Sequence, residues 1–237
     1  MPPKSQELAK RERSTFSDLM KFYESKQYKK GLKAADTILK KSPIHGETLC
    51  MRGLILNCLG RSDEALDNVK KGLRSNMSSH VCWHVYGLVH RSNKNYPEAS
   101  KCYKQALRID PANMSILRDL SLLQIQTRDY AGFAATRHEL LDAKPSARFN
   151  WVAFAMGKHL SGSLDGAVKA IDTFLAQVED GAMEAGDTAR EKEFAIGEME
   201  MYKNDILREM GEVGKAMEHL KSVEGRVLDE GSWLKCK

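Results

Sequence analysis

The segment "SHVCWHVYGLVHRSNKNYPEASKCYKQALRIDP", residues 79–111, spaces its large and small residues at the intervals of two packed helices. Counted from His80 as position 1, the distinctive residues at positions 4, 8, 17, 20, 24, 27 and 32 are Trp83, Gly87, Tyr96, Ala99, Tyr103, Ala106 and Pro111. Intervals of three, four and seven residues place side chains on one face of a helix, and a proline ends it. The segment therefore predicts a helix, a turn and a second helix.

The same pattern recurs when it is shifted by 34 residues. One step back, positions 4, 8, 15, 20, 24 and 27 hold Leu49, Gly53, Gly60, Ala65, Val69 and Gly72. One and two steps forward, the corresponding residues are Leu117, Ser121, Tyr130 and Pro145, and then Trp151, Ala155, Gly162 and Ala167. This period and these residue types are typical of tetratricopeptide (TPR) repeats. We expect an all-α TPR solenoid, in which antiparallel helix pairs form a right-handed superhelix.

Small residues at position 8 carry the packing argument. A glycine inside a helix costs about 0.5–1 kcal/mol relative to alanine, so Gly53 and Gly87 require a compensating gain. We expect that gain from close approach of the two helices of a pair, with position 8 facing position 20. The residues assigned structural roles in the repeats are Gly53, Ala65, Trp83, Gly87, Ala99, Pro111, Ser121, Pro145, Trp151, Ala155 and Ala167.

The repeat register divides the chain into segments. Residues 1–13 form a basic leading segment, and residues 14–181 form the array, with units near 14–45, 46–79, 80–113, 114–147 and 148–181. The phase then shifts, so residues 182–196 are expected to be an insertion or a helix extension. Residues 197–230 form a further TPR-like pair, and residues 231–237 form an irregular tail.

Charge is distributed unevenly along the chain. Residues 1–45 carry 11 Lys and Arg against 5 Asp and Glu, whereas residues 179–237 carry 9 against 15. A basic leading end favours contact with a polyanion, and the alternative is a solvated helix face without a partner. The chain has neither an apolar leading segment typical of a signal peptide nor a membrane-length apolar run, so we expect a cytoplasmic protein with no membrane contact.

Residues suited to catalysis or metal binding do not form a recognisable site. The sequence lacks a P-loop, a nucleophile elbow and a zinc-protease motif, and we expect no catalytic residues, no cofactor and no metal. His80, Cys82, His84 and His90 fall on different faces of a helix and do not converge on one point. The fragment "REMGEV", residues 208–213, weakly resembles a coenzyme A-binding loop, but in the repeat register Gly211 is the turn between two helices.

A binding surface is the remaining candidate for function. The first helix of each TPR unit lines a concave groove suited to a peptide or a partner helix. The groove is expected to present Glu47, Cys50, Leu54, Asn57, His84, Leu88, Arg91, Arg118, Leu122 and His159. Of these, we select Asn57, His84, Leu88, Arg91 and Arg118 as partner-binding candidates. A solvated or half-buried role is the alternative for His84. The clamp of Lys and Asn that grips chaperone tails is missing, because other residue types occupy its positions.

Three segments go beyond the generic repeat, namely "HGETLCMRGLILNCLGR" (45–61), "SHVCWHVYGLVHRSNKNYPEASKCYKQAL" (79–107) and "ILRDLSLLQIQTRDY" (116–130). They closely resemble the N-terminal repeats of the large auxiliary subunit of the NatA N-terminal acetyltransferase. The resemblance implies a scaffold without its own active site, whose partners are the catalytic acetyltransferase subunit and the ribosome. It also implies that basic residues of the leading segment contact ribosomal RNA phosphates. The candidates are Lys4, Lys10, Arg11, Arg13, Lys29, Lys30 and Lys33. The alternative is a TPR peptide-binding adaptor of another protein complex.

Overall fold

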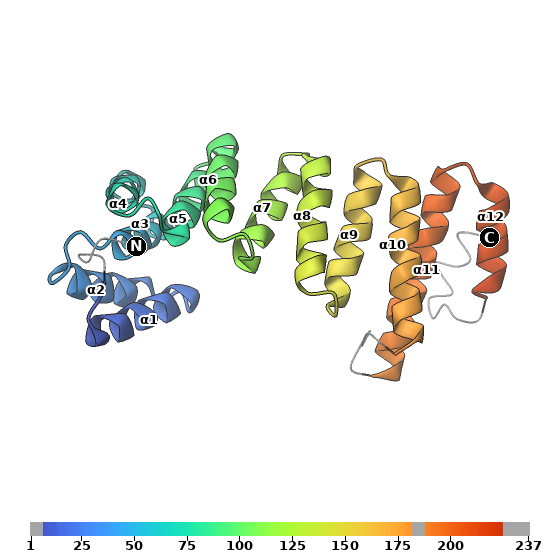
Figure 1. The fold of residues 1–237 in the computed structure, drawn as a ribbon, viewed down its shortest axis with the longest axis horizontal. Coiled ribbons are helices and arrows are strands. Elements are labelled where there is room, and N and C mark those ends of the chain that lie inside the picture. The colour runs from blue at the N-terminus through green and yellow to red at the C-terminus, as the bar shows by residue number, and fades with distance from the viewer. Residues whose placement is uncertain (1–6, 182–187, 225–237) are drawn as a thin grey trace. The chain divides into compact units, whose positions relative to one another are not determined.

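The computed structural model describes residues 7–181 and 188–224, and over these ranges the chain forms helices and no strands (Figure 1). The helices are α1 (Lys10–Glu24), α2 (Tyr28–Leu39), α3 (Gly46–Cys58), α4 (Ser62–Ser75), α5 (His80–Ser92), α6 (Tyr96–Ile109), α7 (Met114–Gln126), α8 (Tyr130–Ala143), α9 (Arg148–Leu160), α10 (Leu164–Glu179), α11 (Ala189–Glu209) and α12 (Val213–Ser222). They belong to two compact units, Met1–Leu123 and Gln124–Lys237. The all-α TPR architecture expected from the sequence is confirmed.

The turn inside each helix pair uses a left-handed backbone residue. These residues are Lys26, Gly60, Lys94, Arg128 and Gly162, at intervals of 34 positions, followed by Gly211. A positive φ angle suits glycine, and it is disfavoured for lysine or arginine because the Cβ atom approaches the following carbonyl. The period is therefore built into the backbone even where the sequence shows no glycine.

Unit 1 buries its apolar side chains between successive helix pairs. Helix α3 packs against α4 and also against α2 and α5 of its neighbours. One core cluster contains Leu19, Ile55, Val69 and Val85, and each is almost completely buried. Side chains of this size contribute about 1.5–3 kcal/mol each when they are fully buried. The stability of each pair therefore depends on the pair beside it.

Close helix approach explains the glycines at position 8. A Cβ atom at Gly53 would lie 2.5 Å from Val69 Cγ2 and 2.7 Å from the carbonyl oxygen of Ala65, which stands at position 20. At Gly87, however, the nearest atom is Tyr103 Cε1 at 2.5 Å, and Tyr103 stands at position 24. Position 8 thus meets the backbone of position 20 at Gly53, as expected, whereas in both units its nearest neighbour is the side chain at position 24, Val69 or Tyr103.

The tryptophans at position 4 have a polar role that the repeat pattern does not reveal. The indole Nε1 of Trp83 donates a hydrogen bond to the Met77 carbonyl at 2.8 Å, and Trp151 donates to the Pro145 carbonyl at 2.8 Å. In both cases the acceptor lies six residues earlier. Each indole thus links the start of a first helix to the loop that precedes it. Trp151 is buried and Trp83 is half-buried, and an indole N–H that is withdrawn from water needs an acceptor.

Unit 2 contains α8 to α12, and α9 packs against both α8 and α10. Its core includes Trp151, Ala155, Phe174 and Ile206. The second helix of the last pair is short, whereas α11 is 21 residues long and begins at a capping box in which Thr188 accepts from the Glu191 amide. Capping of this kind satisfies amide groups that have no partner within the helix.

The helix bounds differ from the expected segments at the start of the first hairpin. Helix α1 begins at Lys10, so the expectation that the first hairpin starts at residue 14 is wrong. In the expected insertion, residues 182–187 lie outside the described residues, and residues 189–196 form the first turns of α11. Residues 225–230 and the expected tail at 231–237 also lie outside the described residues.

Candidate partner-binding surfaces

The basic candidates on α2 form an exposed, uncompensated group. Lys29, Lys30 and Lys33 are exposed, and within the described residues no ion pair joins them to a carboxylate. Lys30 Nζ lies 5.9 Å from the centre of the Phe22 ring. Positions 29 and 33 share one helix face, because they are four residues apart. The three ammonium groups therefore offer positive charge to an external anion.

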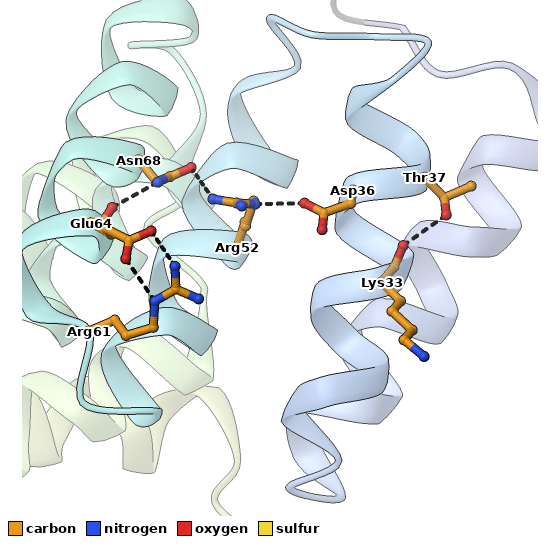
Figure 2. A network of polar contacts seen from close by, with 7 residues as sticks. All are labelled: Lys33, Asp36, Thr37, Arg52, Arg61, Glu64 and Asn68. Atoms are coloured by element: carbon orange, nitrogen blue, oxygen red, sulfur yellow. Dashed lines mark hydrogen bonds and ion pairs between the residues drawn. The ribbon is translucent and has the colours of Figure 1, made fainter.

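A polar network holds α2 against the next helix pair and neutralises its carboxylate (Figure 2). Asp36, the acidic residue of α2, accepts a hydrogen bond from Arg52 Nε of α3 at 2.8 Å. Arg52 Nη1 also donates to Asn68 Oδ1 of α4 at 3.0 Å. In Figure 2 the Lys33 side chain points away from this network, and the Lys33 carbonyl accepts a separate hydrogen bond from Thr37 Oγ1 at 2.8 Å. The network leaves the lysines as the unbalanced charge of α2.

The basic candidates on α1 lie at the other end of this helix pair. Lys10, Arg11 and Arg13 occupy the first turn of α1, and Arg13 Nε donates to the Leu8 carbonyl at 2.9 Å. Because α1 and α2 are antiparallel, this end adjoins the end of α2, where Lys41 Nζ lies 3.8 Å from Glu12 Oε1. A helix rises 1.5 Å per residue, so the basic residues at the start of α1 lie about 16 Å along the helix axis from Lys29, Lys30 and Lys33 at the start of α2.

The candidates on α1 and the candidates on α2 thus form two separate basic groups, one at each end of the helix pair. Sequence reasoning missed Lys26, which is exposed beside Lys29, and Lys40 and Lys41, which are exposed near the start of α1. Antiparallel pairing was the available signal, because it places the start of one helix beside the end of the next. Lys4 lies outside the described residues.

A charged cluster joins α5 to α7 at the groove candidates of unit 1. His84 Nε2 donates to Asp119 Oδ2 at 2.7 Å, and Arg91 Nη1 donates to Asp119 Oδ1 at 2.9 Å. Burial by itself would raise the pKa of the Asp119 carboxyl. The hydrogen bond from His84 and the charge and hydrogen bond of Arg91 outweigh burial, so that pKa lies below its ordinary value of 3.8. Asp119 is therefore a half-buried anion with two partners, which sequence reasoning missed.

The other groove candidates differ in accessibility. Asn57 Nδ2 donates to Ser92 Oγ at 2.9 Å, Leu88 is half-buried against the core, and Arg118 is exposed. Leu122 is also exposed. His159 of unit 2 contacts Tyr202 and Glu209, at 2.8 Å in both cases.

Two expected groove residues are buried. Cys50 and Leu54 belong to the core of unit 1, so the expectation that they line the groove is wrong. The thiol Sγ of Cys50 lies 3.7 Å from the Val69 carbonyl of α4, which places it on the inner face of the pair. Glu47 is half-buried and accepts the Ser79 hydroxyl at 2.8 Å. The repeat register alone does not show which side of α3 the neighbouring helices cover.

The histidines of residues 80–90 point to different neighbours. His80 Nε2 lies 3.8 Å from Asp110 Oδ2, and His84 contacts Asp119. The ring centroid of His90 lies 4.3 Å from that of Tyr86. In the part of the chain that the structure describes, no group of three or more His, Cys, Asp or Glu side chains is placed to hold a metal ion.

Two further features bear on coenzyme A binding and on membrane insertion. Gly211, in the fragment that weakly resembles a coenzyme A-binding loop, has a φ angle of 78° and forms the turn between α11 and α12. None of the helices in the described residues is both long enough and apolar enough to cross a bilayer.

The fold and the repeat register agree with a known group of domains. The family described as "Psidin, N-terminal TPR repeats region" matches residues 16–235. The chain belongs to this family. Curated relatives are similar over nearly all of this chain. The auxiliary subunit NAA15 of the N-terminal acetyltransferase A complex of Arabidopsis thaliana is 48% identical over 98% of this chain and 25% of its own length. Human N-alpha-acetyltransferase 16, a NatA auxiliary subunit, is 43% identical over 97% of this chain and 25% of its own length.

Solved structures support the same relationship. In the structure of Naa15/Naa10 bound to HypK-THB, a 41% identical chain aligns with a TM-score of 0.78, over 95% of this chain and 33% of that chain. The pilus biogenesis factor PilW aligns with a TM-score of 0.56 at 15% identity, a level of similarity that indicates the fold alone. The chain spans about a quarter of the length of the curated relatives it matches.

Proposed function

We propose that this chain is a non-catalytic scaffold, the leading TPR part of a NatA auxiliary subunit. In this role it supports co-translational N-terminal acetylation by contacting the ribosome and the catalytic acetyltransferase subunit. The 48% identity to the Arabidopsis auxiliary subunit and the similarity to the Naa15/Naa10 structure support this assignment. The proposed function places the protein in the cytoplasm.

The observation that carries the ribosome contact is the unbalanced charge of α2. Arg52 pairs with Asp36, whereas Lys29, Lys30 and Lys33 project their charge outward. Ribosomal RNA presents a dense array of phosphates, and lysines that neutralise them release bound counterions. Base stacking requires exposed aromatic rings, and Phe22, the ring beside Lys30, is half-buried. The contact is therefore with backbone phosphates and does not depend on RNA sequence.

Co-sedimentation with ribosomes at increasing salt tests this contact. The variant K29E/K30E/K33E should lose most of its ribosome-dependent pelleting. Its log-log salt dependence should become shallower by about 0.7–0.9 for each phosphate contact that is lost. The matched control K70E/K104E/R108E changes the same number of charges at exposed positions on α4 and α6 and should pellet as the wild type does. Equal pelleting of both variants and the wild type would contradict the proposed ribosome contact.

The scaffold role has two further tests. The purified chain should capture the purified catalytic acetyltransferase subunit, and failure to do so would limit the function of this chain to ribosome contact. Calorimetry should detect no acetyl-CoA binding, and binding at micromolar concentration would contradict a non-catalytic role. If the chain binds neither ribosomes nor the catalytic subunit but does bind a peptide, it is instead a general TPR adaptor.

A further inference from the structure

An apolar groove lies between α9 and α11 of unit 2. It encloses about 760 Å³, and its apolar lining includes Phe149, Met156, Phe194 and Tyr202. Phe149 is 66% exposed, Phe194 is 51% exposed and Met156 is 45% exposed. Single exposed apolar residues are common, but a contiguous apolar row usually marks an interaction site. Tyr202 is packed against the core of the unit, to which Trp151 of α9 belongs, whereas Phe149, Met156 and Phe194 are not among the residues of that core.

The groove has the length and direction of a helix. Short turns join α9 to α10 and α11 to α12, and the chain reverses at alternating ends, so α9 and α11 run in the same direction (Figure 1). His159 contacts both Tyr202 and Glu209, which sets the register between the two helices. Phe149 is then level with Phe194. From residue 194 to residue 208 the wall rises about 21 Å, which corresponds to about four helical turns.

The two walls carry different charges. Arg148 lines the groove from α9, a helix that has no acidic residue. The α11 wall contributes Glu198 and Asp205, and Arg208 Nη1 lies 3.8 Å from Asp205 Oδ1. A ligand seated between the walls therefore meets Arg148 on the α9 side and two carboxylates with the Arg208 guanidinium on the α11 side, so the two walls are opposite in net charge. A complementary ligand has an acidic flank toward α9 and a basic flank toward α11.

We propose that this groove binds one amphipathic helix of a partner protein, with an apolar stripe on the groove floor and flanks of opposite charge. An added β-strand is excluded as the mode of recognition, because the walls are helices whose backbone groups are already paired. The apolar stripe of the partner has anchors at i, i+3 or i+4, and i+7, matching the spacing of Phe149, Val152 and Met156. Methionine side chains in the floor adapt to such anchors because they are flexible and polarisable. Opposite flank charges also set the direction in which the helix lies.

Synthetic helical peptides of about 18 residues, with identical leucine stripes, test this proposal by fluorescence anisotropy. One has an acidic and a basic flank, one has two acidic flanks, and one has two basic flanks. The peptide with mixed flanks should bind most tightly, by at least fivefold. The substitutions Phe194→Ala and Met156→Ala should each weaken it by about tenfold, as is usual for buried interface anchors. Met217→Ala is the control and should have no effect, because Met217 is also an exposed methionine but lies on α12 and does not line the groove.

Reversing the charge of the α9 wall tests whether the flank charges of the peptide determine binding. The substitution Arg148→Glu makes both walls acidic and should shift the preference to the peptide with two basic flanks. Equal binding of all three peptides by the wild type, or an unchanged preference in the Arg148→Glu variant, would overturn the proposal. Circular dichroism of each variant should match the wild type, because the substituted side chains are exposed. These variants should still pellet with ribosomes, so the result is independent of the proposed function.

Another occupant would also overturn the proposal. If the chain self-associates in sedimentation velocity and Phe194→Ala restores the monomer, the groove joins two copies of this chain. If an extended proline-rich peptide binds more tightly than the helix with mixed flanks, the groove recognises an extended segment instead.

Discussion

The close packing of α3 on α4 makes a quantitative prediction for Gly53→Ala. In an open helix this substitution stabilises a protein by about 1 kcal/mol, because alanine has the higher helix propensity. At Gly53 the new Cβ atom would instead lie 2.5 Å from Val69 Cγ2 and 2.7 Å from the Ala65 carbonyl oxygen. A third contact, with the Val69 backbone nitrogen at 3.2 Å, comes from the main chain as well. A different rotamer of Val69 cannot relieve the two main-chain contacts, so the helices must separate.

The net effect follows from two opposing terms. Overpacking of a close-packed core costs about 1–3 kcal/mol, and the main-chain contacts place Gly53 at the upper end of that range. After the gain of about 1 kcal/mol in helix propensity, the variant should lose about 2 kcal/mol of unfolding free energy. With a urea m-value of about 2 kcal/mol/M, the unfolding midpoint should fall by about 1 M.

Urea unfolding followed by circular dichroism measures this midpoint, and hydrogen exchange of α3 and α4 amides localises the effect. Gly214→Ala is the matched control. Gly214 lies in α12, and a Cβ atom there would meet nothing within 4 Å. That variant should be unchanged or more stable by up to about 1 kcal/mol. A Gly53→Ala protein as stable as the Gly214→Ala protein would refute the close-packing explanation of position 8.

Two further predictions concern the charged cluster and the turns. Because folding lowers the pKa of Asp119, its ionised form stabilises unit 1 above its unfolded pKa, and this contribution is lost as pH falls through the folded pKa, below 3.8. Asp119→Asn should therefore lower stability at pH 7 and flatten the acid limb of the stability profile in urea titrations, and an unchanged acid limb would contradict this account. Lys94 has a φ angle of 61°, so Lys94→Gly should raise the thermal midpoint by relieving about 1 kcal/mol of strain. Lys101→Gly, within α6, should lower it by a similar amount, and a fall in both variants would argue against strain at the turn.

The repeat could be read from the sequence because each unit needs particular residues at a few crowded or bent positions. Only a small residue fits at Gly53 and Gly87, and glycine suits the left-handed turns at Gly60 and Gly162. Those demands are local to one helix pair and recur every 34 residues, so they leave a visible period. The turn at Lys94 has the same backbone geometry without glycine, so only the structure shows its left-handed conformation.

The candidate sites were less predictable, because their properties depend on contacts between helices far apart in the chain. Basic composition identified Lys29 and Lys33, but pairing of Asp36 with Arg52, sixteen positions away, makes α2 a positive surface. Burial of Cys50 was missed for a similar reason, since the neighbouring helix decides which side of α3 is covered.

The amino-acid order alone specified helices, their pairing and their interval, since these follow from propensity, residue size and backbone freedom within about 34 neighbouring residues. Folding decided which side chains stay exposed and which charges find partners. The groove beside Phe149 and Phe194 exists only because α10 aligns two helices whose equivalent positions are more than forty residues apart. The spacing of these residues along the chain does not indicate that alignment, because the alignment depends on how α9 and α11 pack with α10.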